Sequence, residues 1–303
     1  MGSSELVQKS FAALSKCMLP KDTFKGKVAF ITGGGTGIGR AITERLSEMG
    51  ASCCIVSRKL DVLDQTAREI REKDPEAKIL TAAADVRNPE AVSSAVDKCV
   101  GDLGLPHIVI NNAAGNFISP TERLSSNAFR SVVDIVLMGT INVTMDIGKR
   151  LIDAKQGANF LGITTVYAHY GSGYVVPSAC AKSGVQTLHR SLASEWGKYG
   201  FRFNCIAPGP IYTKGAFSRL DPGGQFSKEM VKRIPTKRLG ELDEISNLAA
   251  YLVSDYSSWL TGEVINFDGG ELMSMVGEFN SLERVPTEQW DQLASMIKNV
   301  KGS

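Results

Sequence analysis

The chain has 303 residues, of which 43% are hydrophobic and 22% are charged, as is usual for a globular protein. A formal net charge of only +2 gives no reason to expect a nucleic acid partner, and no apolar run reaches the roughly 18 residues that a membrane span needs. The six cysteines and three histidines lack metal-ligand spacing, so we expect no metal site. Most cysteines lie in apolar runs, which indicates buried free thiols and a reducing compartment.

Short apolar runs alternate with helical patterns along the chain. The predicted strands cover residues 28–33, 52–58, 78–86, 107–114, 160–165, 201–209 and 264–270. The predicted helices between them cover 41–50, 63–73, 91–100, 142–154, 185–200 and 244–254. Near-continuous apolar strands, each followed by a helix, indicate a parallel sheet covered on both faces. The predicted fold class is therefore α/β, a single doubly wound, Rossmann-type domain with a seven-stranded parallel sheet.

The sequence also suggests how the rest of the chain is organised. Residues 1–25 are predicted to be an N-terminal extension, and residues 26–271 to be the α/β domain itself. Within that domain, residues 213–235 are predicted to form a substrate loop above the sheet. Residues 272–303 are predicted to be a C-terminal tail that packs on the domain or on a neighbouring subunit, with a last helix over 287–300.

A glycine-rich stretch, TGGGTGIG, follows the first predicted strand and opens a helix. Glycines at such a turn let backbone N–H groups approach a pyrophosphate at the helix N-terminus. The residues expected to bind a dinucleotide here are Gly33, Gly35, Thr36, Gly37, Ile38 and Gly39. The alternative is a glycine turn that serves only packing.

The ends of the second and third predicted strands bear on the choice of cofactor. Ser57, Arg58 and Lys59 follow the second strand, where an acidic residue would favour NAD(H). Two cations and a hydroxyl suit a 2′-phosphate instead, so we expect NADPH/NADP+; the alternative is a solvated Arg-Lys pair. Asp85 and Val86 end the third strand, where the carboxylate is expected to accept a hydrogen bond from the adenine amino group. The alternative for Asp85 is a cap for the next helix.

Two further strand ends are expected to contact the cofactor. Small residues around Asn112 and Ala113, after the fourth strand, let the cofactor lie close to the sheet edge. The loop after the sixth strand is expected to shape the nicotinamide pocket with Pro208, Gly209, Pro210, Ile211 and Thr213.

The motifs T-G-x-x-x-G-x-G, N-N-A-A-G, P-G-P-I-x-T and F-D-G-G occur in this order, and together they resemble the short-chain dehydrogenase/reductase family over residues 26–271. The resemblance implies catalysis by a Ser, a Tyr and a Lys, with a helix Asn in a proton relay. This chain has Ser178 at the tyrosine position, Thr165 at the serine position and Val136 at the asparagine position. Lys182 remains and is expected to hold the nicotinamide ribose from the same helix face as Ser178.

Three longer stretches, NNAAGNFISPTERLS, ITTVYAHYGSGYVVPSACAKSG and PGPIYTKGAFSRLDP, resemble the mitochondrial type of 2,4-dienoyl-CoA reductase within that family. The resemblance implies NADPH-dependent reduction of a 2,4-dienoyl-CoA thioester to a 3-enoyl-CoA in the β-oxidation of unsaturated fatty acids. It also implies a homotetramer and a location in the mitochondrial matrix; a cytoplasmic location is the alternative. The chain ends in Lys-Gly-Ser and not in the Ser-Lys-Leu peroxisomal signal.

The chemistry of dienoyl reduction explains why the family tyrosine is dispensable. Hydride lands on the distant carbon Cδ, and charge moves through the conjugated chain to the thioester oxygen, so hydrogen-bond donors are needed around an extended enolate. Tyr167 and Asn116, after the fifth and fourth strands, are assigned to that oxygen, although Tyr170 and Tyr174 compete with Tyr167 on sequence alone. Tyr167 is also expected to direct protonation at Cα, directly or through water. Ser178 is included among the catalytic residues because it keeps a hydroxyl in place.

A coenzyme A thioester brings phosphates and a long apolar chain. We expect Lys214 and Arg219 to meet the phosphates, and Phe117 and Phe217 to line the acyl tunnel. Arg87 and Ser125 are placed near the pocket mouth. The alternative for each charged residue is a solvated loop side chain.

Two other functions remain open at the level of sequence. One is a reductase of the same family that acts on a 2-enoyl thioester or on a carbonyl. The other is a non-catalytic NADP-binding protein, which the loss of the family tyrosine suggests. The intact glycine loop and the Tyr167–Asn116 pair argue against this second function.

Overall fold

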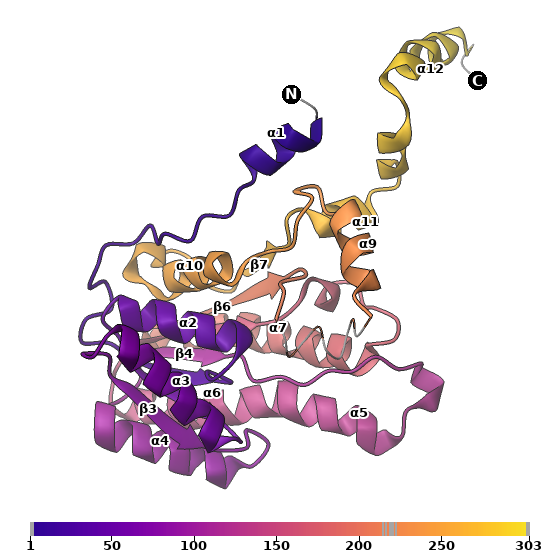
Figure 1. The fold of residues 1–303 in the computed structure, drawn as a ribbon. Helices are drawn as coiled ribbons and strands as arrows, with labels where there is room; N and C mark the ends of the chain where they lie inside the picture. Colours follow the sequence, from indigo (N-terminus) through magenta and orange to yellow (C-terminus); the bar gives the residue numbers. More distant parts are fainter. Residues whose placement is uncertain (1–2, 214, 216, 218–220, 222, 301–303) are drawn as a thin grey trace.

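The central feature of the computed structural model, which describes residues 3–213, 215, 217, 221 and 223–300, is one parallel sheet (Figure 1). Within these residues the strands are β1 (Val28–Thr32), β2 (Ser52–Ser57), β3 (Ile79–Ala83), β4 (Ile108–Asn111), β5 (Ala158–Ile163), β6 (Phe201–Pro208) and β7 (Val264–Phe267). Their order across the sheet is β3-β2-β1-β4-β5-β6-β7. The predicted α/β fold with a seven-stranded parallel sheet is confirmed.

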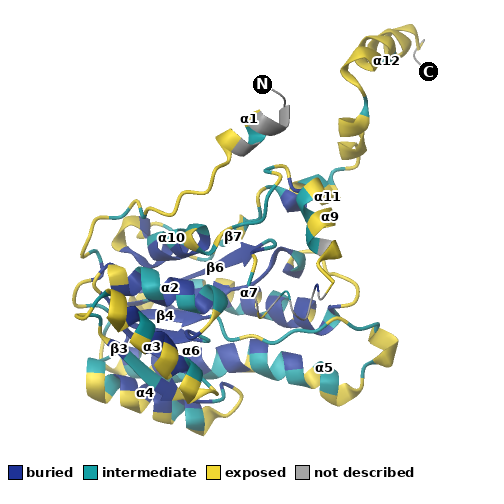
Figure 2. Cartoon of the chain, viewed as in Figure 1, coloured by how far each residue is buried: buried dark blue, intermediate teal, exposed yellow. Residues whose placement is uncertain are grey.

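Helices cover both faces of this sheet. One face carries α2 (Gly37–Glu48), α3 (Leu60–Lys73) and α10 (Leu242–Val253), and the other carries α4 (Pro89–Leu103), α6 (Gly139–Asp153) and α7 (Val176–Trp196). Successive strand residues point to opposite faces. In β1, Ala29 and Ile31 accordingly join the first hydrophobic cluster, whereas Val28 and Phe30 join the second. Figure 2 shows the resulting band of buried strands between half-buried helices.

The strand order places the crevice where a ligand is expected to bind. From β1 the chain moves outward through β2 and β3, and it then returns to β4 on the other side of β1. Connections therefore leave the carboxyl ends of β1 and β4 in opposite directions, and in doubly wound sheets ligands bind at this switch point. The loops after β1, β4, β5 and β6 all reach this edge.

One helical run is longer than the sequence indicated. The chain continues from α5 (Ser126–Val133) through a π-helical turn, η2 (Asp134–Met138), into α6, whereas only 142–154 was predicted. By length and mean hydropathy alone this run of 28 residues could cross a membrane, the single such helix among the described residues. Several of its apolar side chains nevertheless pack inside the protein: Val143 and Ile147 lie in the core beside the sheet, and Val136 packs against α7. We conclude that it is a core helix.

Further helices and turns were not predicted or differ at their ends. These are α1 (Ser3–Ser10), α9 (Gln225–Arg233), α11 (Glu271–Val276), η1 (Thr121–Arg123), η3 (Val166–Ala168), η4 (Gly197–Tyr199), η5 (Asp255–Ser257) and η6 (Asn280–Arg284). The last helix, α12 (Thr287–Asn299), matches the predicted one within a residue. Figures 1 and 2 show α1 and α12 extending away from the sheet, with α12 exposed along its length. The predicted domain boundaries remain predictions.

Four aromatic side chains fill the core on the α7 side of β5 and β6. The rings of Phe160 and Phe203 stack with centroids 4.5 Å apart, and Trp196 meets Phe201 and Phe203 edge-on. All four residues are buried, so water is excluded from this side of the sheet. Aromatic pairs of this kind stabilise a core beyond the area that they bury.

We predict that Phe203→Ala lowers the free energy of unfolding by about 3–5 kcal/mol, because a fully buried ring is lost and a cavity is left. Tyr199→Ala, which removes a ring that is 39% exposed, should cost about 1 kcal/mol or less. Urea unfolding of both variants is the measurement. Equal losses would contradict the assignment of Phe203 to the core.

Candidate active site

The glycine loop after β1 has the shape required to receive a pyrophosphate. Gly33 has φ +68°, and a methyl group added to Gly39 would lie 2.2 Å from the Gly33 carbonyl oxygen. Thr36 precedes α2 without making a capping hydrogen bond, and the first turn of α2 contains no acidic residue. The backbone N–H groups of that turn are therefore neither capped by Thr36 nor opposed by a carboxylate, which suits an anionic ligand. The sequence analysis treated phosphate binding and packing as alternatives for these glycines, and the geometry is compatible with both.

Asn112 has a structural task in this loop. Its Nδ2 donates to the Thr32 carbonyl oxygen at 3.0 Å, and the backbone N–H groups of Asn112 and Ala113 both donate to Thr32 Oγ1 at 3.0 Å. These bonds fasten the glycine loop to the end of β4. A methyl group on Gly35 would lie 3.0 Å from Leu63 on α3, so the other side of the loop is packed as well. Cofactor contacts by Asn112, Ala113 and Ile38 remain predictions.

The end of β3 corrects two expectations. The strand stops at Ala83, so Asp85 and Val86 lie in the turn beyond it. The cap of α4 is Asn88, whose side chain accepts from Ala91 N at 3.0 Å, and the alternative role of Asp85 as that cap is therefore wrong. Asp85 is instead bound by the Arg87 guanidinium, whose Nε lies 3.0 and 3.1 Å from its two oxygens.

The Asp85–Arg87 ion pair lies at the predicted adenine site and bears on the charges around it. The hydrogen bonds from Arg87 hold the pKa of Asp85 below its usual value, and the charge of Arg58 lowers it further. The structure places Arg87 in the turn after β3, where it pairs with Asp85. Its expected place near the pocket mouth remains a prediction. Arg58 and Lys59 follow Ser57 at the end of β2, and their side chains are exposed without a hydrogen bond or ion pair to any described residue. Two unpaired cations at this position remain suited to a 2′-phosphate.

Three predicted catalytic side chains meet at the carboxyl edge. The Tyr167 hydroxyl lies 3.1 Å from Ser178 Oγ and accepts a hydrogen bond from Asn116 Nδ2 at 3.2 Å. Asn116 comes from the loop after β4, Tyr167 from η3 after β5, and Ser178 from the first turn of α7. The sequence separations are 51 and 11 residues, so the fold alone brings these groups together.

The geometry also distinguishes Tyr167 from its two rivals. Tyr170 and Tyr174 are 44% and 64% exposed, and neither hydroxyl forms a hydrogen bond with a described residue. The Asn116 amide is oriented by its own Oδ1, which accepts from Phe117 N at 2.9 Å and turns Nδ2 toward Tyr167. The expected preference for Tyr167 therefore has geometric support, while its catalytic role remains a prediction.

Two residues that the sequence analysis missed fix the position of η3. Ser183 on α7 donates through Oγ to the Ala168 carbonyl oxygen at 2.5 Å. His169 Nε2 lies 2.8 Å from Asn266 Oδ1 on β7. Tyr167 is thus held between α7 and β7 by its two neighbours. The 97-residue separation of His169 and Asn266 leaves no local signal in the sequence.

Lys182 lies on the same helix as Ser178, and both side chains are buried. Its Nζ donates a hydrogen bond to the Ile163 carbonyl oxygen at the end of β5. Burial lowers the pKa of Lys182 from 10.5 to about 8. Val136, at the family asparagine position, is 1% exposed and lies with Ala181 in an apolar cluster, so it supplies no hydrogen bond there.

We predict a specific pH dependence of stability from Lys182. Its folded pKa of about 8 is depressed from 10.5, so the unfolded chain binds the proton more tightly, and the resulting penalty is complete below pH 8 and absent above pH 10.5. The free energy of unfolding of the unmodified protein, minus that of Lys182→Met, should therefore rise with pH across this window. Urea titrations of both proteins test this; a constant difference would contradict burial of a titrating lysine.

The predicted substrate residues are only partly gathered at this edge. Phe117 packs against the cluster that contains Val136, and the Phe217 ring lies 5.1 Å from that of Tyr212. Ser125 caps α5 by accepting from Ala128 N at 3.1 Å, which is a structural role. Lys214 and Arg219 lie outside the described residues. The substrate contacts of all these residues remain predictions.

The loop after β6 is firmly held next to the glycine loop. Gly209 N donates to the Phe267 carbonyl oxygen at 3.0 Å, and Pro210 O accepts from Gly240 N at 3.1 Å. A methyl group on Gly37 would lie 3.4 Å from Thr213 Cγ2, which places Thr213 against the start of α2. The roles of Pro208, Gly209, Pro210, Ile211 and Thr213 at the nicotinamide remain predictions.

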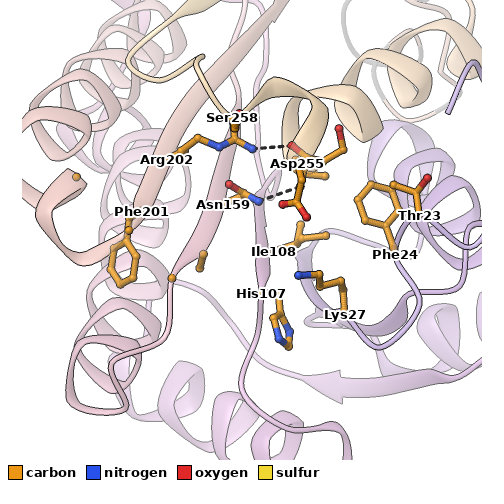
Figure 3. Close-up of a pocket in the computed structure, with 16 residues that line it drawn as sticks. Thr23, Phe24, Lys27, His107, Ile108, Asn159, Phe201, Arg202, Asp255 and Ser258 are labelled. Atoms are coloured by element: carbon orange, nitrogen blue, oxygen red, sulfur yellow. Dashed lines mark hydrogen bonds between the residues drawn. The ribbon is translucent and has the colours of Figure 1, made fainter. Parts of the chain in front are cut away.

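A separate cavity of about 440 Å³ lies at the amino ends of β4, β5 and β6 (Figure 3). Two of its polar side chains are occupied by the fold: Asn159 Nδ2 donates to Val253 O at 2.9 Å, and Arg202 Nη2 donates to Ser254 O at 2.9 Å. The cluster around Tyr167 follows the carboxyl end of β5, at the opposite edge of the sheet. This cavity is therefore not the candidate reaction site.

Comparison with known proteins places this geometry in context. Residues 33–271 match the family model described as enoyl-(acyl carrier protein) reductase. The chain is 46% identical to an uncharacterized oxidoreductase of Caenorhabditis elegans, over 97% of this chain and 96% of the relative. It is 43% identical to a probable 2,4-dienoyl-CoA reductase [(3E)-enoyl-CoA-producing] of the same organism, over 97% of both chains. A probable 2,4-dienoyl-CoA reductase [(2E)-enoyl-CoA-producing] of Bacillus subtilis is 38% identical, over 82% of this chain and 97% of the relative.

Solved structures show the same architecture. A short-chain dehydrogenase from Bacillus anthracis superposes with a TM-score of 0.75 at 37% identity, covering 82% of this chain and 97% of that one. A putative NAD(P)-dependent gluconate 5-dehydrogenase from Beutenbergia cavernae, with NADP bound, has a TM-score of 0.77 at 27% identity, covering 84% of this chain and all of that one.

Proposed function

Because the chain belongs to the short-chain dehydrogenase/reductase family, we propose that it reduces 2,4-dienoyl-CoA thioesters to 3-enoyl-CoA with NADPH. The observation that carries the proposal is the cluster of Tyr167, Asn116 and Ser178, with a serine in the place of the family tyrosine. Relatives along the full chain that are named 2,4-dienoyl-CoA reductases support the same reaction class.

The arrangement of the cluster suits an enolate that develops far from the site of hydride transfer. NADPH, when bound, would supply a hydride to Cδ of the dienoyl chain. The negative charge then collects on the thioester oxygen, where donors stabilise it most effectively if they are already in place. Tyr167 Oη and Asn116 Nδ2 are 3.2 Å apart, close enough to donate jointly to one oxygen atom. Ser178 supports the Tyr167 hydroxyl from the other side.

The position of protonation decides the product. The extended enolate accepts a proton at Cα, which gives a 3-enoyl product, or at Cγ, which gives a 2-enoyl product. Tyr167 holds the thioester oxygen, and Cα is one bond removed from the thioester carbon. We therefore propose protonation at Cα, by Tyr167 or through a water that it binds. The Bacillus subtilis relative, which is named as a 2-enoyl producer, makes the other product the specific alternative.

The choice of NADPH is supported by the two exposed cations after β2. Arg58 and Lys59 lie where a 2′-phosphate would extend from the adenosine ribose, and Arg87 shields the nearby Asp85 carboxylate. Lys182, buried on the same helix as Ser178, is proposed to hold the nicotinamide ribose. Participation in unsaturated fatty acid β-oxidation, a homotetrameric assembly and a mitochondrial location, with cytoplasm as the alternative, remain predictions.

We predict that Tyr167→Phe lowers kcat on a 2,4-dienoyl-CoA by about 10²–10³, since one donor to the developing oxyanion is lost. The Kd for NADPH should change little. Tyr174→Phe makes the same chemical change on the same loop, on a side chain that is 64% exposed, and should leave kcat within about threefold. Stopped-flow measurement of NADPH oxidation tests this, and equal losses for both variants would remove Tyr167 from the mechanism.

Arg58→Ala should weaken NADPH binding by about 10- to 100-fold, the usual effect of losing one charge-assisted hydrogen bond to a phosphate. Binding of NADH, which has no 2′-phosphate, should change about twofold or less. Fluorescence titration with both nucleotides is the measurement. Equal weakening for the two would mean that Arg58 does not contact the 2′-phosphate.

A further inference from the structure

An ion pair between a buried carboxylate and an exposed guanidinium joins two helices beyond the carboxyl ends of β6 and β7. Glu271, the first residue of α11, is 3% exposed. Its Oε1 accepts from Arg233 Nε at 2.7 Å and also from Arg233 Nη2. Arg233 is the last residue of α9, which Figure 1 shows beside α11. The Nε and Nη2 donors along one edge of the Arg233 guanidinium therefore converge on a single oxygen of the buried Glu271 carboxylate.

The chain that follows Arg233 is packed onto the turn before Glu271. Gly269 and Gly270 have φ +63° and +87°, and methyl groups there would lie 2.5 Å from Thr236 Oγ1 and 3.0 Å from Pro235 Cγ. Ile234 is 1% exposed. The C-terminal end of α9 is consequently fixed by close packing, and the ion pair adds a polar contact between α9 and α11.

The same carboxylate lies next to two other parts of the candidate site. A methyl group on Gly209 would approach Glu271 Oε2 to 3.3 Å, so Glu271 lies against the loop after β6. Tyr170, three residues after Tyr167, has a pKa raised first by burial and then by the charge of Glu271. Glu271 thus contacts α9 and lies against the loop after β6, and its charge acts on the loop that carries Tyr167.

We propose that Glu271 and Arg233 are positioning residues that hold α9 as one wall of the acyl-CoA site, without contacting the reacting carbons. The inference rests on the proposed function, because it concerns the substrate side of that same site. An ion pair with one exposed partner adds little to stability, but two donors on one buried oxygen restrict the orientation of the Arg233 side chain. Its effect is therefore expected on substrate binding more than on the chemical step.

The test compares Arg233→Gln and Glu271→Gln with a matched control on the same helix. Lys232 pairs with Glu229 at 2.6 Å, but both side chains are about two-thirds exposed, so Lys232→Gln removes an ion pair without loosening α9. Each site variant should raise KM for a 2,4-dienoyl-CoA by about tenfold or more, with kcat within about threefold and the Kd for NADPH unchanged. The double variant should be no worse than either single one. Arg233→Lys, which keeps the charge, should have an intermediate KM and covers the case in which a Gln variant fails to fold.

Hydrogen exchange of residues 225–237 without substrate provides a second readout that is independent of the reaction. Exchange should become at least about tenfold faster in Arg233→Gln and Glu271→Gln and stay unchanged in Lys232→Gln. Unchanged exchange would overturn the positioning role. Faster exchange with an unaltered KM, or an equal fall in kcat, would overturn the role in substrate binding. If the unmodified protein turns over no dienoyl thioester, the proposed function fails, while the exchange data still test how α9 is held.

Discussion

The parallel pairing of β1 with β4 is the constraint on which the candidate site depends. It places the glycine loop, the Asn116 loop and the loops after β5 and β6 at one edge of the sheet. Thr32 strengthens this junction, because its hydroxyl receives two backbone N–H groups from the start of the next loop. The sheet topology thereby brings together groups that are distant in sequence. The core on both sheet faces keeps this edge rigid, as preorganised donors require.

The presence of Ser178 at the family tyrosine position is explained, under the proposed function, if the hydrogen-bond donors have moved from that position to Tyr167 and Asn116. In reduction of a ketone the proton and the hydride go to adjacent atoms, and an acid near the nicotinamide serves that reaction. In a conjugated thioester the charge is carried several bonds away. Tyr167, one turn beyond the end of β5, meets Asn116 there and keeps a bond to Ser178. Under the proposed function, the same scaffold would serve a longer substrate through Ser178 in the tyrosine position and the donors Tyr167 and Asn116.

Periodicity was sufficient to predict the sheet, because buried parallel strands are continuous apolar runs and the helices between them are amphipathic. It extended the third strand too far, because the strand ends at Ala83 and the apolar composition continues past it. Pairing between distant residues gave no such signal. Arg87 was separated from Asp85 in our expectations, and the Arg233–Glu271 pair spans 38 residues, so only the fold reveals it. Resemblance alone favoured Tyr167 over Tyr170 and Tyr174. Its contact with Ser178 gives a physical reason for that preference.

The central claim is that hydride and proton reach carbons that are far apart, and isotope labelling of the product tests it most directly. A 2,4-dienoyl-CoA would be reduced with deuterated NADPH in water and, separately, with ordinary NADPH in heavy water, and each product examined by NMR. The account predicts cofactor deuterium on Cδ, solvent deuterium on Cα and a double bond between Cβ and Cγ. Cofactor deuterium on Cβ, or solvent deuterium on Cγ with a double bond between Cα and Cβ, would contradict it.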